Sequence, residues 1–255
     1  MRFYKSKETI EEIKRIINNK EHGLYLRFGD GDVNLANGSK DLLQASNEAL
    51  KKEMIEAFKI NDVNVLKALP LHCEEYGLEV GMFPGNHECD KVWADNLLNK
   101  VKPFWGKSFD KIYSPVALHF LATVEPDYIL NFFKFLKLNK PIAIIGNKNI
   151  QPEIVDKLFG LDCKHIKTPI ENSFNSIDSS ELEFDKIYKP NQYNLIITAM
   201  GCSGRVLQKR LYKKYDNIFI FDFGSLMDAL CGWNTRAWIE LSKFNKDEFL
   251  KKLYA

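Results

Sequence analysis

The chain lacks several features that would mark it as a membrane or secreted protein. It has no run of about 18 or more apolar residues, which excludes a membrane-spanning helix. Its first residues, MRFYKSKETIEEIKR, carry charges where a secretory signal peptide has its apolar core. The five cysteines are odd in number and lack the spacing of a disulfide framework, which is typical of a reducing compartment. We therefore expect a cytoplasmic protein.

The chain also lacks a strong charge of one sign. Its 36 Lys and Arg residues nearly balance 34 Asp and Glu residues, and the net charge is +2. Domains that bind nucleic acid usually show a clear basic excess, so we expect no nucleic-acid partner.

Apolar residues are plentiful and follow the pattern of an α/β protein. They make up 45% of the 255 residues, and a chain of this length buries roughly three quarters of the surface it exposes when unfolded. Four segments are predicted strands, apolar on both faces: Leu24–Phe28, Pro141–Ile145, Tyr193–Met200 and Asn217–Phe223. They alternate with stretches of helical spacing, which indicates a parallel sheet covered on both sides. We predict a Rossmann-like, mostly parallel sheet with helices on both faces, in a single domain over 1–255.

The remaining pattern predicts further elements with less regular spacing. Helices are expected over Leu42–Phe58, Cys89–Val101, Asp127–Leu138, Glu153–Phe159 and Arg205–Tyr215. Strands are expected over Val63–Leu71, Ile112–Leu118 and His165–Pro169. The polar segment Glu171–Glu183 is expected to be a mobile loop.

The segment from Arg27 to Asp32 has the most specific pattern, Arg-Phe-Gly-Asp-Gly-Asp. In an extended segment, Asp30 and Asp32 point to the same side and can share one divalent cation, directly or through water. Gly29 and Gly31 remove side-chain bulk, so a phosphate group can approach the backbone closely. Arg27 adds a positive charge that suits a diphosphate. The same residues also fit a hairpin turn with solvated acids.

A second glycine turn, residues 201–205, lies between a predicted strand and a predicted helix. Gly201 and Gly204 expose backbone N–H groups at the helix N-terminus, where an anion is favoured. Ser203 and Arg205 can add side-chain donors. An ordinary tight strand–helix turn explains the pattern equally well.

The turn Gly146-Asn147-Lys148 follows another predicted strand and is a weaker phosphate-binding candidate. Parallel sheets bind ligands outside the carboxyl ends of their strands, where all three turns are expected. A solvated surface lysine is the alternative for Lys148.

Three side chains are candidates for a general base. Asp222 ends a predicted strand, and Asp228 lies six residues later near a helical turn. His119 follows another predicted strand, although a core histidine explains it as well. An acid at a helix N-terminus is the alternative for Asp228. Trp233, close to Asp228, can stack on a sugar.

Two other chemistries find little support. The pairs His72-Cys73 and His87-x-Cys89 lack the spacing of a structural zinc site. A serine hydrolase is disfavoured because no G-x-S-x-G motif is present.

Taken together, these motifs resemble the bacterial glycosyltransferases of the GT-D fold type. That family reads Arg-aromatic-Gly-Asp-Gly-Glu where this chain has residues 27–32, and its acidic pair holds the metal of the nucleotide sugar. The likeness continues at Asn194–Gly204 and at Phe221–Asp228, which is similar to the family's Asp-x-Gly-Ser segment, and it extends over about 8–240. Asp32 stands where the family has Glu, so the second acid is one methylene shorter.

The resemblance implies a metal-dependent, inverting glycosyltransferase that uses a UDP-sugar. Mn²⁺ or Mg²⁺ is expected near Asp30 and Asp32. The side chains expected to hold the phosphates are Arg27, Lys148, Ser203 and Arg205. Asp228 is the first candidate for the base that deprotonates the acceptor hydroxyl, followed by His119 and Asp222.

Two alternatives remain open from the sequence. A metal-dependent phosphohydrolase acting on nucleotides or nucleotide sugars would use the same acids and glycine turns. A non-catalytic module would bind a nucleotide sugar without turnover. As a transferase, the protein would act on the hydroxyl of a glycan or glycoconjugate, and membrane association would be peripheral.

Overall fold

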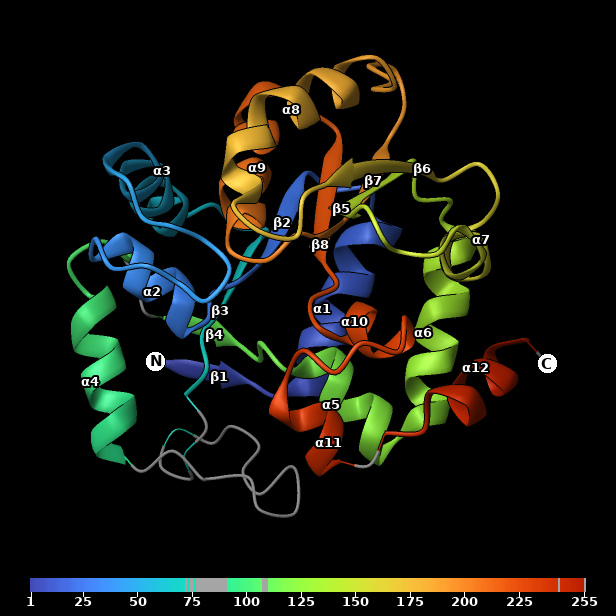
Figure 1. Ribbon diagram of the computed structural model, residues 1–255, viewed down its shortest axis with the longest axis horizontal. Coiled ribbons are helices and arrows are strands. Elements are labelled where there is room, and N and C mark those ends of the chain that lie inside the picture. Colours follow the sequence, from blue (N-terminus) through green and yellow to red (C-terminus); the bar gives the residue numbers. More distant parts are fainter. Residues whose placement is uncertain (72, 74–75, 77–90, 107–109, 243, 255) are drawn as a thin grey trace.

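The protein is built around one eight-stranded sheet, shown in a computed structural model that describes residues 1–71, 73, 76, 91–106, 110–242 and 244–254. The strand order is β1-β4-β3-β2-β8-β7-β5-β6, and all neighbours pair in parallel (Figure 1). The strands are β1 (Arg2–Tyr4), β2 (Gly23–Arg27), β3 (Val65–Ala68), β4 (Lys111–Tyr113), β5 (Ala143–Asn147), β6 (Lys164–Thr168), β7 (Asn194–Ala199) and β8 (Ile218–Asp222). The predicted α/β fold with a parallel sheet is confirmed.

Helices cover both faces of this sheet, as predicted (Figure 1). One face carries α1 (Ser6–Asn18), α5 (Ala117–Val124), α6 (Pro126–Leu138), α7 (Pro152–Phe159), α10 (Leu226–Leu230), α11 (Ala237–Leu241) and α12 (Lys246–Tyr254). The other carries α2 (Asp30–Ala36), α3 (Glu48–Lys59), α4 (Lys91–Val101), α8 (Ile177–Asp185) and α9 (Ser203–Lys214). Within the described ranges, no helix combines the length and apolar character needed to cross a bilayer.

Side-chain alternation along the strands divides the interior into two cores. In β8, Ile218 and Ile220 point into the core under α9, whereas Phe219 and Phe221 point into the core under α6. All four side chains are fully buried. Burial on both faces explains why the central strands read as continuous apolar runs.

The centre of the sheet opens between β2 and β8. Their ladder ends where Tyr25 pairs with Phe221. Beyond that pair, β2 leads into α2 on one face and β8 leads into α10 on the other. Two side chains of α9 then bind carbonyls of β2: Gln208 Nε2 donates to the Tyr25 carbonyl at 3.2 Å, and Arg205 Nε donates to that of Arg27. A crevice at such a divergence is the usual ligand site of open parallel sheets.

The helix predicted over Leu42–Phe58 begins later, at Glu48. Asn47 caps it, because its side chain accepts a hydrogen bond from the Leu50 N–H at 2.8 Å. The residues before Asn47 form a loop that reaches the central crevice.

The strand predicted over Ile112–Leu118 ends at Tyr113. Pro115 follows and has no N–H for a sheet ladder, and α5 begins at Ala117. His119 therefore lies within the first turn of a helix rather than after a strand. Of the other predicted helices, residues 91–101 are helical as expected, whereas 89 and 90, like His72 and His87, lie outside the described residues.

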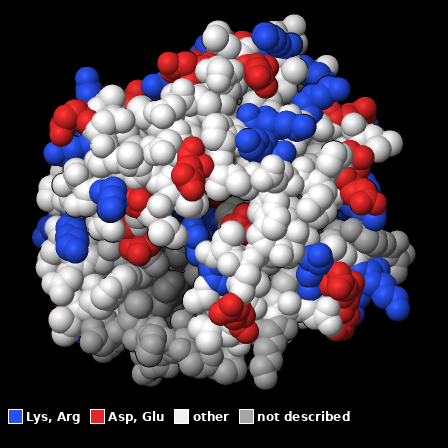
Figure 2. Space-filling view, viewed as in Figure 1, with Lys and Arg blue, Asp and Glu red and all other residues white. Residues whose placement is uncertain are grey.

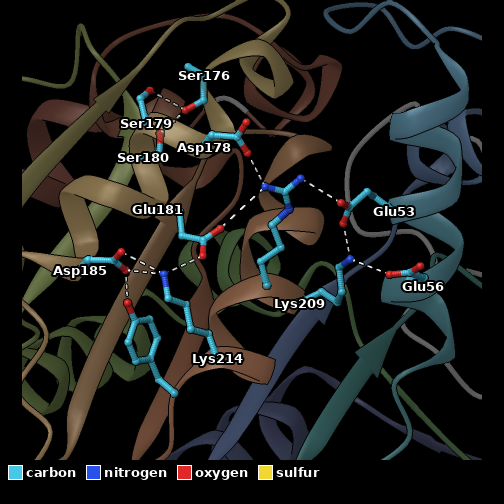
Figure 3. A network of polar contacts seen from close by, with 12 residues as sticks. Glu53, Glu56, Ser176, Asp178, Ser179, Ser180, Glu181, Asp185, Lys209 and Lys214 are labelled. Carbon is cyan, nitrogen blue, oxygen red and sulfur yellow. Dashed lines mark hydrogen bonds and ion pairs between the residues drawn. The ribbon is translucent and has the colours of Figure 1, made fainter.

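The segment Glu171–Glu183, predicted as a loop, is mostly helical. A 3₁₀ turn (Ser173–Ser176) leads into α8, which packs on α9. Ion pairs join the two helices: Arg210 Nη1 lies 2.5 Å from Asp178 Oδ1, and Lys214 Nζ lies 2.9 Å from Glu181 Oε1 (Figure 3). Two of the acids that suggested a loop, Asp178 and Glu181, are therefore partners for basic residues of α9.

Candidate active site

A cavity of about 350 Å³ opens at the crevice between β2 and β8. Figure 2 shows this face hollowed near its centre, with acidic and basic side chains around the hollow. The floor is formed by Arg27, Arg205 and Asp222. What we term the α2 wall includes Asp30, Asp32, Asp41, Gln44, Ser173, Cys202 and Ser203. What we term the α10 wall includes His119, Asp228, Thr235, Arg236 and Trp238.

On the floor, Arg205 joins two buried carboxylates. Its Nη1 lies 2.6 Å from Asp222 Oδ2, and its Nε lies 3.7 Å from Asp32 Oδ2. Nη1 also donates to the Gly201 carbonyl at 3.0 Å. Arg205 was predicted to hold a phosphate, but its Nε and Nη1 are already held by these protein groups. It instead links the ends of β2, β7 and β8.

Arg27 is held beside the same carboxylate. Its Nε donates to the Pro115 carbonyl at 2.5 Å, and its Nη1 lies 3.8 Å from Asp222 Oδ1. The guanidinium also covers Gly224, which has φ +64°, and a Cβ built there would lie 1.3 Å from Arg27 Nη1. A larger residue here would be strained by the positive φ and would displace the Arg27 guanidinium.

Asp30 and Asp32 do not lie in an extended segment, so the predicted geometry of the pair is wrong. Both belong to the first turn of α2, where side chains two residues apart point to different sides of the helix. Asp30 is exposed, whereas Asp32 is buried and accepts a hydrogen bond from the Gly29 N–H at 2.7 Å. Burial raises the pKa of Asp32 to about 6, although Arg205 favours its charged form.

The α2 wall still offers oxygen ligands for a cation. Asp32 Oδ1 is buried and finds no hydrogen-bond partner among the described residues. Asp41 packs against Gly31, where a Cβ would lie 2.2 Å from Asp41 Oδ1, and Asp30 lines the same cavity. No three ligand-type residues in the described part are arranged as a complete metal site. Mg²⁺ commonly binds one or two carboxylates together with substrate phosphates and water, and these residues fit that mode.

The turn before α9 supplies the back of the α2 wall. Gly201 has φ +62° and lines the cavity, but the Ser203 hydroxyl donates to Gln44 Oε1 at 2.8 Å. Gly204 packs against Met200 instead of facing the cavity. Ser203, predicted to hold a phosphate, is thus already hydrogen-bonded.

Lys148 does not belong to this site as the structure describes it. It is exposed after β5 and is not among the described residues that line the cavity.

The α10 wall holds the other predicted acid. Asp228 is partly buried, and its Oδ2 accepts a hydrogen bond from Thr235 Oγ1 at 2.6 Å. Burial raises the pKa of Asp228, while the Thr235 hydroxyl and the charge of Arg236 oppose this rise. Asp222, in contrast, forms an ion pair with Arg205.

His119 also lines the cavity on the α10 wall. Its ring stacks on Trp238 at 4.7 Å between centroids, and Trp238 Nε1 donates to Ser225 Oγ at 2.9 Å. Trp238, rather than Trp233, is the tryptophan that lines the cavity among the described residues.

Several site residues were missed by the sequence analysis. Gln44 falls in the part of the predicted helix that is a loop, and Asp41 immediately precedes that predicted helix. Thr235 and Arg236 are polar residues of a surface loop. Gly224 had a usable signal, since glycine after a strand end often marks a left-handed turn.

Nearly all the residues that form this cavity belong to a segment that matches a known protein family. Residues 25–236 match the family model of the glycosyltransferase GT-D fold. The chain belongs to the GT-D-fold family of glycosyltransferases. The match begins within β2 and ends at Arg236, so it spans the floor, the α2 wall and the α10 wall except for Trp238.

Solved structures show the same fold as this GT-D-fold chain. Two of them are structures of the domain of unknown function 1792, one selenomethionine-substituted and one described as having a distinct glycosyltransferase fold. Each is 19% identical to this chain with a TM-score of 0.63. The alignment covers 94% of this chain and 82% of theirs. A third, described as a new glycosyltransferase from Streptococcus sanguinis, shows 15% identity and a TM-score of 0.61, covering 99% and 85%. No curated protein matches the chain.

Proposed function

We propose that this GT-D-fold glycosyltransferase is metal-dependent and inverting, and that it transfers a sugar from a UDP-sugar to a hydroxyl of a glycan or glycoconjugate. One observation supports this most strongly: the carboxylates of the α2 wall and Asp228 of the α10 wall line one cavity, and α2 and α10 pack on opposite faces of the sheet. Inversion requires the base and the leaving group on opposite faces of the sugar.

The α2 wall is assigned to the leaving diphosphate. Asp32 would offer Oδ1, which is unpartnered among the described residues, to Mn²⁺ or Mg²⁺, and Asp30 and Asp41, which line the same cavity, would bind the ion directly or through water. When bound, the cation would neutralise the charge that develops on the departing nucleotide. Gly201 gives the diphosphate access to the N-terminus of α9, where backbone N–H groups favour an anion.

The α10 wall is assigned to the acceptor. Asp228 would take the proton of the attacking hydroxyl through Oδ1, since Oδ2 is held by Thr235. Its raised pKa makes it a better proton acceptor than an exposed carboxylate. Asp222 is assigned to positioning Arg205, and His119 is the second candidate for the base.

Donor hydrolysis by the purified protein tests this proposal. UDP-, GDP-, dTDP- and CMP-sugars are incubated with Mn²⁺, with and without EDTA, and nucleotide release is measured. We expect slow release from one donor, lost with EDTA and in Asp30→Ala. Asp247→Ala, an exposed aspartate of α12, serves as the matched control and should keep full activity.

Stability measurements on the same variants separate the roles. Asp30 is exposed, so Asp30→Ala should leave the melting temperature nearly unchanged while activity falls. Equal loss of activity and stability would contradict the metal role. Phosphate release from nucleotides alone would indicate a phosphohydrolase, and nucleotide binding without turnover with any acceptor would indicate a binding module.

A further inference from the structure

Three arginines line the cavity, and they differ in what neutralises them. Arg27 and Arg205 lie on the floor with Asp222 between them, and their side chains are 14% and 10% exposed. Arg236 is exposed on the α10 wall, and its recorded hydrogen bond runs from Nη1 to the Thr235 carbonyl at 2.8 Å. No carboxylate in the described part of the chain lies within ion-pair distance of its guanidinium.

The loop that carries Arg236 is fixed on both sides. Immediately before it, the Thr235 hydroxyl is bound to Asp228. Two residues after it, Trp238 is buried, stacks on His119 and donates to Ser225 Oγ. The backbone that presents Arg236 to the cavity is therefore already ordered, which lowers the entropy cost of holding a ligand.

The other charges in the cavity leave the Arg236 guanidinium without an ion-pair partner among the described residues. Asp222 and Asp32 neutralise the two floor arginines, and further carboxylates lie on both walls. Among the described lining residues, Arg236 is thus the permanent cation left to meet an anionic ligand. A planar guanidinium binds phosphate oxygens in pairs, and most of its N–H donors here are unused.

We propose that Arg236 is the phosphate-binding residue of the α10 wall. The inference rests on the proposed function, because it assumes that the cavity receives the two substrates of a sugar transfer. The phosphate can come from two sources: the diphosphate of the donor, or an anionic group on the acceptor next to the hydroxyl that Asp228 deprotonates.

Calorimetric titrations at fixed ionic strength distinguish the two sources. The variants are Arg236→Met, which keeps the aliphatic length, Arg236→Lys, which keeps the charge, and Arg2→Met, an exposed arginine remote from the cavity, as the control. In the donor arm, the probes are UDP with Mn²⁺ and uridine. In the acceptor arm, the UDP-loaded protein is titrated with glucose 1-phosphate and with methyl glucoside.

If the phosphate belongs to the donor, Arg236→Met weakens UDP binding by about ten- to a hundredfold and leaves uridine binding unchanged. If it belongs to the acceptor, the variant binds UDP normally but loses a similar factor for glucose 1-phosphate, while methyl glucoside is unaffected. Arg236→Lys should retain part of the affinity in either case, because it lacks the paired geometry but keeps the charge.

Wild-type affinity for both phosphate probes in Arg236→Met would overturn the inference. If the wild-type protein binds UDP but not glucose 1-phosphate, the UDP titrations alone decide, and wild-type UDP affinity in Arg236→Met then overturns the inference. Failure of the wild-type protein to bind any nucleotide would overturn the proposed function together with the inference. Melting temperatures of the variants should match the wild type, since Arg236 is exposed.

Discussion

Arg205 Nη1 lies 2.6 Å from Asp222 Oδ2 at the floor of the cavity, with both side chains almost fully buried. The pair joins the helix after β7 to the end of β8, and Asp32 adds a carboxylate from the helix after β2. The site is therefore organised around a buried cluster of ion pairs that joins three strand ends.

Arg205→Met should destabilise the fold by about 3–5 kcal/mol, because it leaves buried carboxylates without a counter-charge. The free energy of unfolding is measured by urea denaturation. The double variant Arg205→Met/Asp222→Asn should lose less than the sum of the two single variants, because the remaining buried charge is smaller. A cost below about 1 kcal/mol for Arg205→Met would show that the cluster does not support the fold.

Gly224→Ala should be far more harmful than Gly201→Ala. Both glycines have nearly the same positive φ, +64° and +62°, so each alanine costs about 1–2 kcal/mol of backbone strain. At Gly201 nothing lies within 4 Å of the new methyl group, whereas at Gly224 it collides with Arg27. An added cost of about 1–3 kcal/mol is expected for Gly224→Ala. Equal melting temperatures for the two variants would refute the close packing of Arg27 on Gly224.

The free energy of unfolding should depend on pH through Lys67. Burial lowers its pKa from 10.5 to about 8, while its Nζ donates to the carbonyls of Phe58 and Trp105. Between pH 8 and 10.5 the unfolded chain binds more protons than the folded one at this site, so Lys67 makes the free energy of unfolding rise with pH across that window.

The test compares wild type with Lys67→Met over pH 7–10.5, using Lys52→Met on the exposed side of α3 as control. The rise attributed to Lys67 should be absent from Lys67→Met and present in Lys52→Met. Lys67→Met should also be less stable overall, because two buried carbonyls lose their donor. Identical slopes for all three proteins would contradict the lowered pKa.

Thr235→Val should shift the pH dependence of transfer. The Thr235 hydroxyl lowers the pKa of Asp228, so its removal raises that pKa, and the acid limb of kcat/KM moves to higher pH. Thr235→Ser keeps the hydroxyl and should restore the wild-type profile. An acid limb unmoved in Thr235→Val would argue against Asp228 as the base.

The sheet could be predicted from the sequence because its signal is local. Strands β7 and β8 are apolar on both faces, and that pattern does not depend on any distant residue. The end of β4 was missed, although Pro115 gave a local reason for it.

Other parts depend on contacts that the sequence does not reveal. Helix α8 looked like a loop because its acids are explained only by Arg210 and Lys214 on α9. Asp30 and Asp32 were recognised as a pair, but their geometry was not, because α2 begins at Asp30 and the Asp32 side chain turns back to accept a hydrogen bond from the Gly29 N–H. Arg236 gave no signal, since an arginine in a polar loop resembles any surface residue until its neighbours are known.

The ladder between β2 and β8 stops at Tyr25, and the carbonyls beyond it are bound by Gln208 and Arg205. These side chains from α9 replace the partner strand that β2 no longer has. The crevice lies beyond the last residues that the two strands pair, so a ligand can occupy it without displacing a paired strand. The side chains that bind β2 there come from α9, a helix already packed on the sheet.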